Sequence, residues 1–139
     1  MTEPEADGAI IAGVQRMLAT DHASQQLGIR VLSAGGDQAV AQMEVRADMA
    51  NGHSIAHGGL IFALADTAFI CACATNSRVA VTSSASIIYI SPARVGDVLT
   101  ATATVRNRFG RAVHCDVTVT SGSGVVAEFR GSAIQVTST

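Results

Sequence analysis

The sequence of 139 residues contains no lysine, and charged residues make up only 14% of it. Its nine basic residues are all arginine, and eleven acidic residues bring the formal net charge to -2 at pH 7. A chain without a basic excess cannot neutralise a nucleic-acid backbone, which argues against a general nucleic-acid-binding protein. Because 48% of the residues are hydrophobic, the scarcity of charge also excludes a disordered, solvated chain.

Cysteine is scarce as well, and the spacing of the three present (Cys71, Cys73 and Cys115) fits neither a zinc knuckle nor a C-x-x-C motif. We therefore expect small buried thiols in a reducing compartment. The acidic start MTEPEADG lacks an apolar leader, and the longest apolar run, residues 60–75, is shorter than the ~20 residues that span a bilayer. These features predict a cytoplasmic protein that does not associate with a membrane.

Hydrophobic periodicity predicts helices and strands in a definite order. An amphipathic helix is expected over residues 8–27, with a break near Asp21 and a stop at Gly28. Strands are expected at residues 29–33 and 38–46, joined by turn residues 34–37, and then at 79–90, 97–108, 112–121 and 125–136. No helical pattern separates the last four strands, which predicts antiparallel pairing.

Residues 60–75 are apolar in every direction of a helical wheel apart from Asp66, a pattern typical of a buried helix. Such a helix is about 24 Å long, and a small domain can bury it only by wrapping a sheet around it. The pattern predicts an α+β hotdog fold, with an antiparallel six-stranded sheet wrapped around a long central helix. We expect one domain over residues 1–139, with residues 1–7 disordered.

Asp66 is the first candidate for chemistry, because it is the only charged residue between His57 and Arg78. A buried carboxylate is costly unless it is paired, hydrogen-bonded or protonated. One interpretation is a core aspartate bonded to a neighbour such as Thr67. The other is an acid, base or nucleophile at the edge of a cleft, where perturbed carboxylates concentrate.

The segment His57-Gly58-Gly59 precedes the apolar helix and offers a second candidate. The first N–H groups of a helix have no internal partners and can polarise a carbonyl oxygen as it becomes an oxyanion. The alternative is a tight loop-to-helix turn. Gly58 and Asp66 are eight residues apart, about 12 Å along a helix, so one substrate cannot touch both in the same chain. If both act, the active unit is a homodimer with composite sites.

Three stretches carry a specific resemblance. The sequence N-G-H-S-I-A-H-G-G-L-I-F-A-L-A-D-T-A-F at residues 51–69 resembles the signature of the PaaI-type thioesterases of phenylacetate degradation, in the hotdog thioesterase superfamily. Residues 89–97 and 129–131 resemble two further landmarks of that family. The resemblance implies hydrolysis of aryl- or arylacetyl-coenzyme A, with coenzyme A as part of the substrate and no separate cofactor. It favours a homotetramer, although the residues leave dimer versus tetramer open.

The resemblance also implies roles for individual residues. Asp66 matches the catalytic carboxylate, as base or nucleophile, and Gly58 matches the residue whose N–H polarises the thioester carbonyl. Asn51 matches a positioning asparagine, although it also fits an ordinary Asn-Gly turn, and His57 lies beside the site. The family often places a hydroxyl on the following strand, where we favour Thr82 over Ser83 and Ser84.

Coenzyme A requires cationic partners for its phosphates, and arginine binds phosphate in a bidentate way. Arg106, Arg108 and Arg111 crowd one turn, which fits either a solvated hairpin tip or a binding site. The resemblance favours binding. The implied contacts are Gly59, Tyr89, Ile90, Ser91, Pro92, Ala93, Arg94, Arg108, Phe109, Gly110, Arg111, Ala112 and Val113.

Other interpretations compete with this one. His53 and His57 are four residues apart, but no glutamate lies between them, so we expect no metal site. A hotdog dehydratase or hydratase would use a histidine with a carboxylate, and His57 is the candidate histidine for that reaction. A non-catalytic module that senses acyl-coenzyme A is a third possibility, although a sensor has little use for a buried carboxylate.

Overall fold

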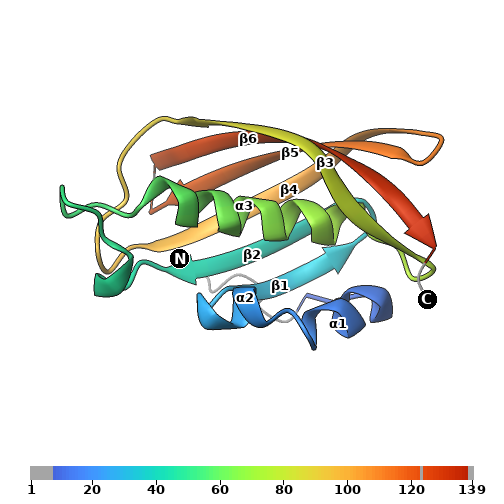
Figure 1. Ribbon diagram of the computed structural model, residues 1–139, viewed down its shortest axis with the longest axis horizontal. Helices are drawn as coiled ribbons and strands as arrows, with labels where there is room; N and C mark the ends of the chain where they lie inside the picture. Colours follow the sequence, from blue (N-terminus) through green and yellow to red (C-terminus); the bar gives the residue numbers. More distant parts are fainter. Residues whose placement is uncertain (1–7, 123, 138–139) are drawn as a thin grey trace.

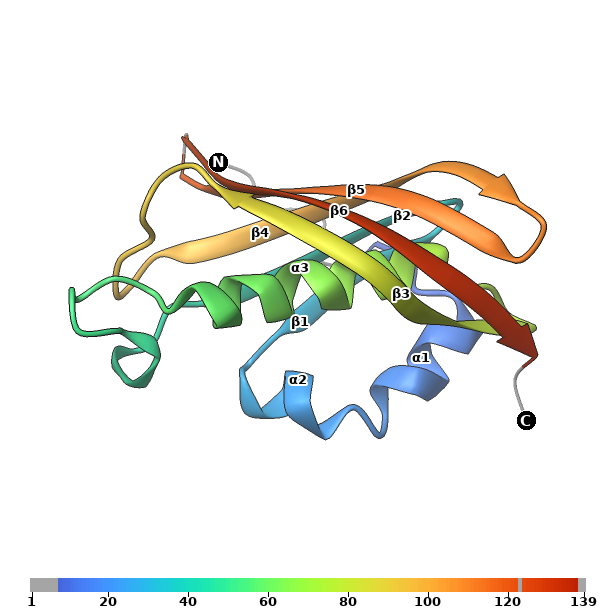
Figure 2. The ribbon, with the colours of Figure 1, turned by 45° about the horizontal axis from the view of Figure 1, so that its top comes forward.

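Six strands form one antiparallel sheet that curls around the helix α3 (Figures 1 and 2). The computed structural model describes residues 8–122 and 124–137, so the disorder expected for residues 1–7 lies outside the described residues. The helices are α1 (Ala12–Leu18), α2 (His22–Gln26), the short 3-10 helix η1 (Ala47–Met49) and α3 (Gly58–Cys73). The strands are β1 (Arg30–Gly35), β2 (Gln38–Glu44), β3 (Arg78–Tyr89), β4 (Val98–Phe109), β5 (Ala112–Ser121) and β6 (Gly124–Thr137).

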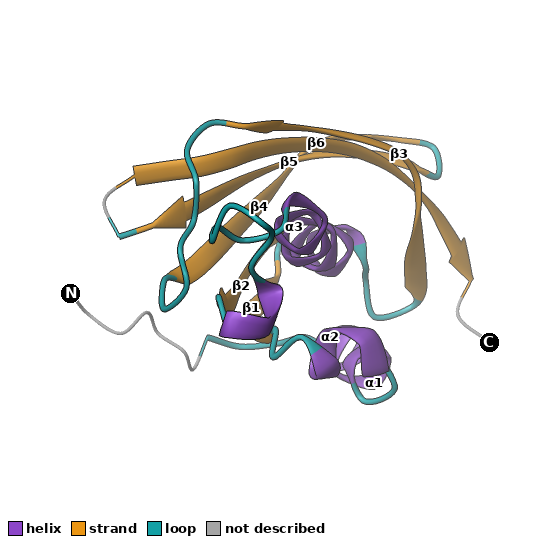
Figure 3. Ribbon diagram, turned by 60° about the vertical axis from the view of Figure 1, so that its left-hand side comes forward, coloured by secondary structure: helices purple, strands orange, loops and turns teal. Residues whose placement is uncertain are grey.

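The strand order β1-β2-β4-β5-β6-β3 places β1 and β3 at the two edges of the sheet. Every pair of neighbouring strands is antiparallel, as expected. Figure 3 shows the sheet curving over α3, with α1 and α2 on the other side of that helix. The prediction of a hotdog fold is confirmed, and α3 lies between the sheet and the N-terminal helices.

The burial of α3 differs from the expectation that it would be buried all round. Its buried residues include Leu64, Ala65, Ala68 and Phe69, which face the sheet. A stripe on another face is only half-buried, and it contains Ala63, Asp66, Thr67 and Ile70. The expectation of complete burial was wrong because the N-terminal helices cover this stripe only in part. Asp66 therefore reaches a solvent-accessible cavity instead of a sealed core.

The N-terminal helical segment breaks where the sequence predicts. Asp21 caps α2, because its carboxylate accepts hydrogen bonds from the Ser24 backbone N–H at 3.1 Å and the Ser24 hydroxyl at 2.7 Å. Gly28 follows α2 with φ of +73°, a backbone conformation that favours glycine. The break and the stop near these residues are both confirmed.

Gly131 on β6 makes room for the aromatic part of the core. A Cβ atom at this position would lie 2.8 Å from Cζ of Phe69, which itself stacks near Phe129 with ring centroids 5.4 Å apart. We expect Gly131→Ala to lower the free energy of unfolding by about 1–3 kcal/mol, as overpacking does. Urea denaturation should show this loss. Gly52→Ala is the control, because nothing lies within 4 Å of its Cβ position, and its stability should match the parent.

Candidate active site

Asp66 lies halfway along α3 and lines a cavity of about 250 Å³ between α3 and the N-terminal helices. Its Oδ1 accepts a hydrogen bond from the Thr82 hydroxyl at 3.1 Å. Burial raises the pKa of this carboxyl above its ordinary value of 3.8, and the hydrogen bond from Thr82 opposes part of that rise. A half-buried carboxylate with a raised pKa, open to a cavity, is suited to accept a proton or attack a carbonyl.

Thr82 contacts Asp66 because β3 is irregular at this point. The pairing of β3 with β6 shifts between Thr82 and Ser84, as in a β-bulge. The Ser83 hydroxyl instead donates to the Ser132 carbonyl oxygen at 3.0 Å. Of the three hydroxyls that the sequence leaves in competition, Thr82 is therefore the one bonded to the carboxylate.

The contact between Thr82 and Asp66 predicts a change in the pH profile. Thr82→Val removes the hydrogen bond that lowers the pKa of Asp66, and the burial that raises it remains. If Asp66 must be ionised to act, the acidic limb of kcat/KM should move to higher pH in the variant. Steady-state rates between pH 4 and 9 measure this shift. Ser83→Ala is the control, and a Thr82→Val profile that overlays the parent would contradict the coupling.

Gly58 is the first residue of α3, and the backbone N–H groups of Gly58 and Gly59 donate to no acceptor within the described part of the chain. Tyr89 closes over this end of the helix, because its hydroxyl donates to the Gly58 carbonyl oxygen at 2.7 Å. Burial raises the pKa of this phenol, which stays protonated and able to donate. The Gly58 amide is thus available to an external carbonyl.

A second cavity, of about 410 Å³, lies at this end of α3 and is lined by Asn51, Gly58, Tyr89 and the segment Ile90–Ala93. The Asn51 carbonyl oxygen Oδ1 accepts from the backbone N–H groups of His53 and Ile55, so Asn51 organises its own loop as well as lining the cavity. His57 is the N-cap of α3, and its side chain is exposed.

The two cavities share no lining residue. Asp66 opens into the first cavity and Gly58 into the second, and the eight residues between them correspond to about 12 Å of helix. A thioester bound within hydrogen-bond distance of one group does not reach the other in the same chain. Within one chain, the Asp66 carboxylate and the Gly58 amide therefore lie in two separate cavities, and neither cavity contains both groups.

The residues predicted to bind coenzyme A also fall into two groups. Residues 89–94 lie at the start of α3, where the backbone of Arg94 pairs with Ile55. The hairpin at residues 108–113 lies at the other end, where Arg108 donates to the Cys73 carbonyl oxygen and forms an ion pair with Asp37 at 2.8 Å. Within one chain, the two groups cannot hold the same nucleotide.

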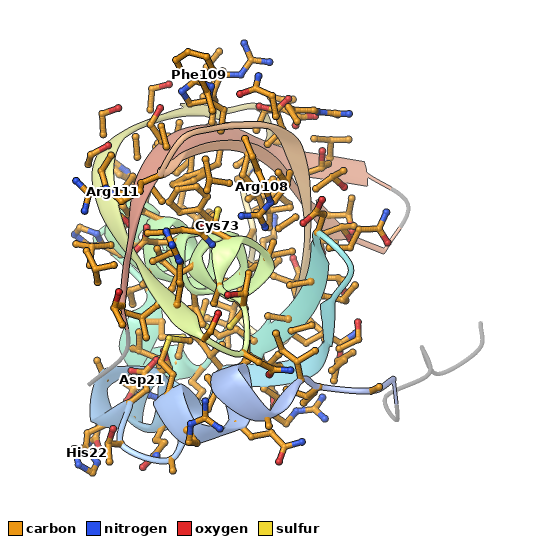
Figure 4. The ribbon with its side chains drawn as sticks, turned by 90° about the vertical axis from the view of Figure 1, so that its right-hand side faces the viewer. Asp21, His22, Cys73, Arg108, Phe109 and Arg111 are labelled. Carbon is orange, nitrogen blue, oxygen red and sulfur yellow. The ribbon has the colours of Figure 1, made fainter. Side chains whose placement is uncertain are left out.

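Side chains within the hairpin differ in what they can contact. Figure 4 shows Arg108 directed toward Cys73, while Phe109 stands at the outer rim of the sheet. Phe109 is 82% exposed, Arg111 is exposed, and Val113 is completely buried, so only the backbone of Val113 could meet a ligand. Arg108 is held by Asp37 and the Cys73 carbonyl oxygen, whereas the exposed side chain of Arg111 forms no ion pair or hydrogen bond with the described residues.

Arg106 is close to this turn in the sequence, but its side chain forms an ion pair with Asp116. It lies on the outer face of the sheet with Arg130, and both donate to Asp116, at 2.9 and 2.7 Å. The hydrogen bonds and charges of the two guanidinium groups hold the pKa of Asp116 below its ordinary value. This cluster lies outside both cavities that contain candidate catalytic groups.

Asp21 and Ser24 also line the Asp66 cavity, which was not predicted from the sequence. Their spacing marks the start of a short helix, and no pattern links that helix to α3.

The described residues bring together no three His, Cys, Asp or Glu side chains that could hold a metal ion. Cys71, Cys73 and Cys115 are buried, free thiols. No helix among the described residues has the length and apolarity that a bilayer crossing requires.

Comparison with known proteins places this geometry in context. The family model described as "Thioesterase superfamily" matches residues 53–128. Acyl-coenzyme A thioesterase PaaI of Escherichia coli is 39% identical over 121 residues, which cover 86% of this chain and 86% of that protein. The structure of E. coli PaaI, from the phenylacetic acid degradation operon, aligns with a TM-score of 0.87 over 91% of this chain and 93% of that one.

Two further structures are similar. A mutant of the phenylacetic acid degradation protein PaaI from Thermus thermophilus is 36% identical, with a TM-score of 0.80 over 84% of this chain and 100% of that one. A Streptococcus mutans protein solved with acetyl-CoA bound is 26% identical, with a TM-score of 0.73 over 77% of this chain and 87% of that one.

Proposed function

Because the chain belongs to the thioesterase superfamily and is an acyl-CoA thioesterase of the PaaI type, we propose that it hydrolyses aryl- and arylacetyl-CoA thioesters to the free acid and CoA. One observation carries the proposal: Asp66, a carboxylate with a raised pKa, opens into a mostly apolar cavity of about 250 Å³. That volume suits an acyl group of the size of a phenylacetyl group, and the carboxylate lies at its edge.

In this proposal Asp66 either takes a proton from water as the water oxygen attacks the thioester carbon, or attacks that carbon itself. The carbon–sulfur bond then breaks, and the thiolate of CoA leaves and takes up a proton. In the first route this step gives the free acid. In the second route it leaves the acyl group as an anhydride on Asp66, which water hydrolyses to the free acid and the restored carboxylate. Thr82 orients the carboxylate through its hydrogen bond. The Gly58 N–H polarises the carbonyl oxygen, and Asn51 and His57 lie beside it to position the thioester.

The proposed active unit is a homodimer, because Asp66 and Gly58 must come from different subunits to meet one thioester. The edge strand β3 offers the pairing surface. The other edge strand, β1, is partly covered by a bridge between Ile10 and Ala34, whereas β3 pairs only with β6 among the described residues. Eleven of the twelve residues of β3 are not buried, and they include Val81 and Ile88. A long edge of this kind is a template for a second chain.

The contacts of β3 also suggest the register of that pairing. Thr82 marks the Asp66 end and Tyr89 marks the Gly58 end of the strand. Antiparallel pairing that sets Thr82 opposite Tyr89 of the partner subunit brings the two half-sites together. The two-fold axis then passes between Ala85 and Ser86.

The same arrangement gives a role to the two groups of predicted CoA contacts. In an antiparallel dimer, the start of one α3 lies near the end of the other, so Tyr89–Arg94 of one subunit and the hairpin of its partner approach each other. We propose that Arg94 and Arg111, both exposed, bind the phosphates there. We further propose that dimers pair into a tetramer and that the protein works in the cytoplasm, where its three free thiols stay reduced.

The test is release of free CoA thiol from a panel of acyl-CoA substrates by the purified protein. Phenylacetyl-CoA should be hydrolysed with a higher kcat/KM than acetyl-CoA or a long-chain acyl-CoA. Loss or gain of enoyl absorbance with crotonyl- and 3-hydroxyacyl-CoA would instead indicate a dehydratase or hydratase. Tight binding of acyl-CoA without turnover would indicate a sensor, and either result would contradict the proposal.

A further inference from the structure

The wall of the Asp66 cavity that faces α3 comes from the N-terminal segment, residues 17–29. Met17 and Leu27 supply apolar surface, and they face Ala63 and Ile70 on the half-buried stripe of α3. Apolar atoms make up most of the lining, and the polar groups are confined to Asp66 and a second cluster on α2 and α3. The cavity is therefore an apolar recess with the candidate catalytic carboxylate in its rim.

The two cavities of the composite site have different shapes and neighbours. The thioester carbon would lie between Asp66 and the Gly58 amide, so the acyl group and the pantetheine arm must leave in opposite directions. The Gly58 cavity is larger and is lined by Ile90 and Pro92. The exposed Arg94 follows this lining segment in the chain and is a cation that suits CoA. The smaller Asp66 cavity is the one left for the acyl group.

We propose that the cavity between α2 and α3 binds the acyl group, and that Met17, Ala23 and Leu27 of the N-terminal segment determine which acyl groups are accepted. This inference rests on the proposed function. A cavity of about 250 Å³ matches the size of a single ring or a short branched chain. The substrate class is a compact, uncharged acyl group.

The hydroxyl groups of Ser24 and Thr67 connect α2 to α3. The Ser24 hydroxyl lies 3.1 Å from the Thr67 hydroxyl, and it also donates to Asp21 at 2.7 Å. Thr67 can donate to the Ala63 carbonyl oxygen at 2.9 Å. The two hydroxyls have two protons for three contacts, so Ser24 and Thr67 bond to each other only when one of them turns from its other acceptor. This link next to Asp66 sets the width of the cavity and connects α2 to the helix that carries the carboxylate.

The Asp21 carboxylate gives the cavity a second acidic group besides Asp66. An acyl group that ends in a carboxylate would place a third negative charge between them, at a cost that a low-dielectric recess increases. The arrangement therefore discriminates against dicarboxylic acyl-CoA such as succinyl-CoA. Asp21→Asn keeps the helix cap, because asparagine is an equally good N-cap residue, and it removes the charge.

The experiment compares kcat/KM for acetyl-, phenylacetyl-, naphthylacetyl- and succinyl-CoA. Ala23→Phe fills the cavity from an exposed position on α2 and should lower the phenylacetyl-to-acetyl ratio by about tenfold or more. Met17→Ala enlarges the cavity and should raise the naphthylacetyl-to-phenylacetyl ratio by a similar factor. Asp21→Asn should raise relative use of succinyl-CoA several-fold. Gln26→Phe, on the exposed side of α2 and outside the cavity, is the matched control.

Ratios that stay constant in both size variants, with wild-type turnover intact, would overturn the inference and leave the proposed function standing. A change of acyl preference in Ile90→Ala, in place of a uniform change in KM, would assign the acyl group to the Gly58 cavity and would also overturn it. A wild-type protein that hydrolyses none of the four substrates would contradict both. Circular dichroism melting checks that each variant folds, and Met17→Ala carries the test if Ala23→Phe does not fold.

Discussion

Replacing Asp66 with asparagine is expected to lower kcat for phenylacetyl-CoA hydrolysis by roughly 10²–10⁴-fold, the usual range for loss of a general base. An amide cannot accept a proton from water at neutral pH or act as an oxygen nucleophile toward the thioester. Its oxygen can still accept the hydrogen bond that Thr82 donates at 3.1 Å, so the local geometry should persist. Thiol release by the purified variant measures the loss.

The stability of the same variant separates catalysis from folding. Burial raises the folded pKa of Asp66 above the ordinary 3.8, so between these two values the folded state holds more protons than the unfolded state. The free energy of unfolding therefore falls as the pH rises through this window. Asp66→Asn should lack that fall and should be as stable as the parent, or more stable, at neutral pH.

The exposed Asp48 provides the matched control, because among the described residues it forms an ion pair only with Arg46 at the surface. Asp48→Asn should retain parental turnover. A variant of Asp66 that unfolds at neutral pH would show a structural role for the carboxylate, and one with parental kcat would remove Asp66 from the mechanism.

Replacing Gly58 with proline is expected to lower kcat by about 10²–10³-fold, the effect of removing one oxyanion donor. Gly58 is the first residue of α3, a position at which proline fits because its missing N–H would have no partner within the helix. The preceding residue, His57, has φ of -63° and ψ of 131°, an extended conformation that suits a residue before proline. The helix should therefore form without the amide.

Gly58→Ala is the control that isolates the amide. Both substitutions add a Cβ about 3.1 Å from the Tyr89 ring, so both disturb that contact, but alanine keeps the N–H. We expect alanine to cost far less in kcat than proline. Equal losses in the two variants would show that packing against Tyr89, and not the Gly58 amide, is what the reaction requires.

The fold was predictable because each element carries its own local pattern. Alternation of alanine and threonine in residues 100–104 marks a strand, and the Gly36-Asp37 pair marks a two-residue turn in which both residues have positive φ. The degree of burial of α3 was not predictable. The helical wheel of this segment is apolar on all sides apart from Asp66. Only the position of α1 and α2 determines that one stripe of α3 stays half-buried.

A candidate residue was predictable where it stands out from its surroundings, as Asp66 does in an apolar helix. Thr82 could only be favoured over its serine neighbours, because the bulge that selects it is a property of the β3–β6 pairing. Asp21 and Ser24 could not be found, since their approach to Asp66 depends on tertiary packing between α2 and α3. Arg108 looks like a phosphate ligand in the sequence, yet it binds Asp37 and the end of α3.

The central claim is that each site combines Asp66 of one subunit with the Gly58 amide of the other. Subunit complementation tests it: Asp66→Asn and Gly58→Pro chains are unfolded together, refolded as a mixture and assayed with phenylacetyl-CoA. In a random mixture half of the dimers are mixed, and each has one site with both parental groups, so the mixture should recover about a quarter of parental activity. Activity no higher than that of the two separate variants, in a mixture shown to contain mixed dimers, would contradict the shared site.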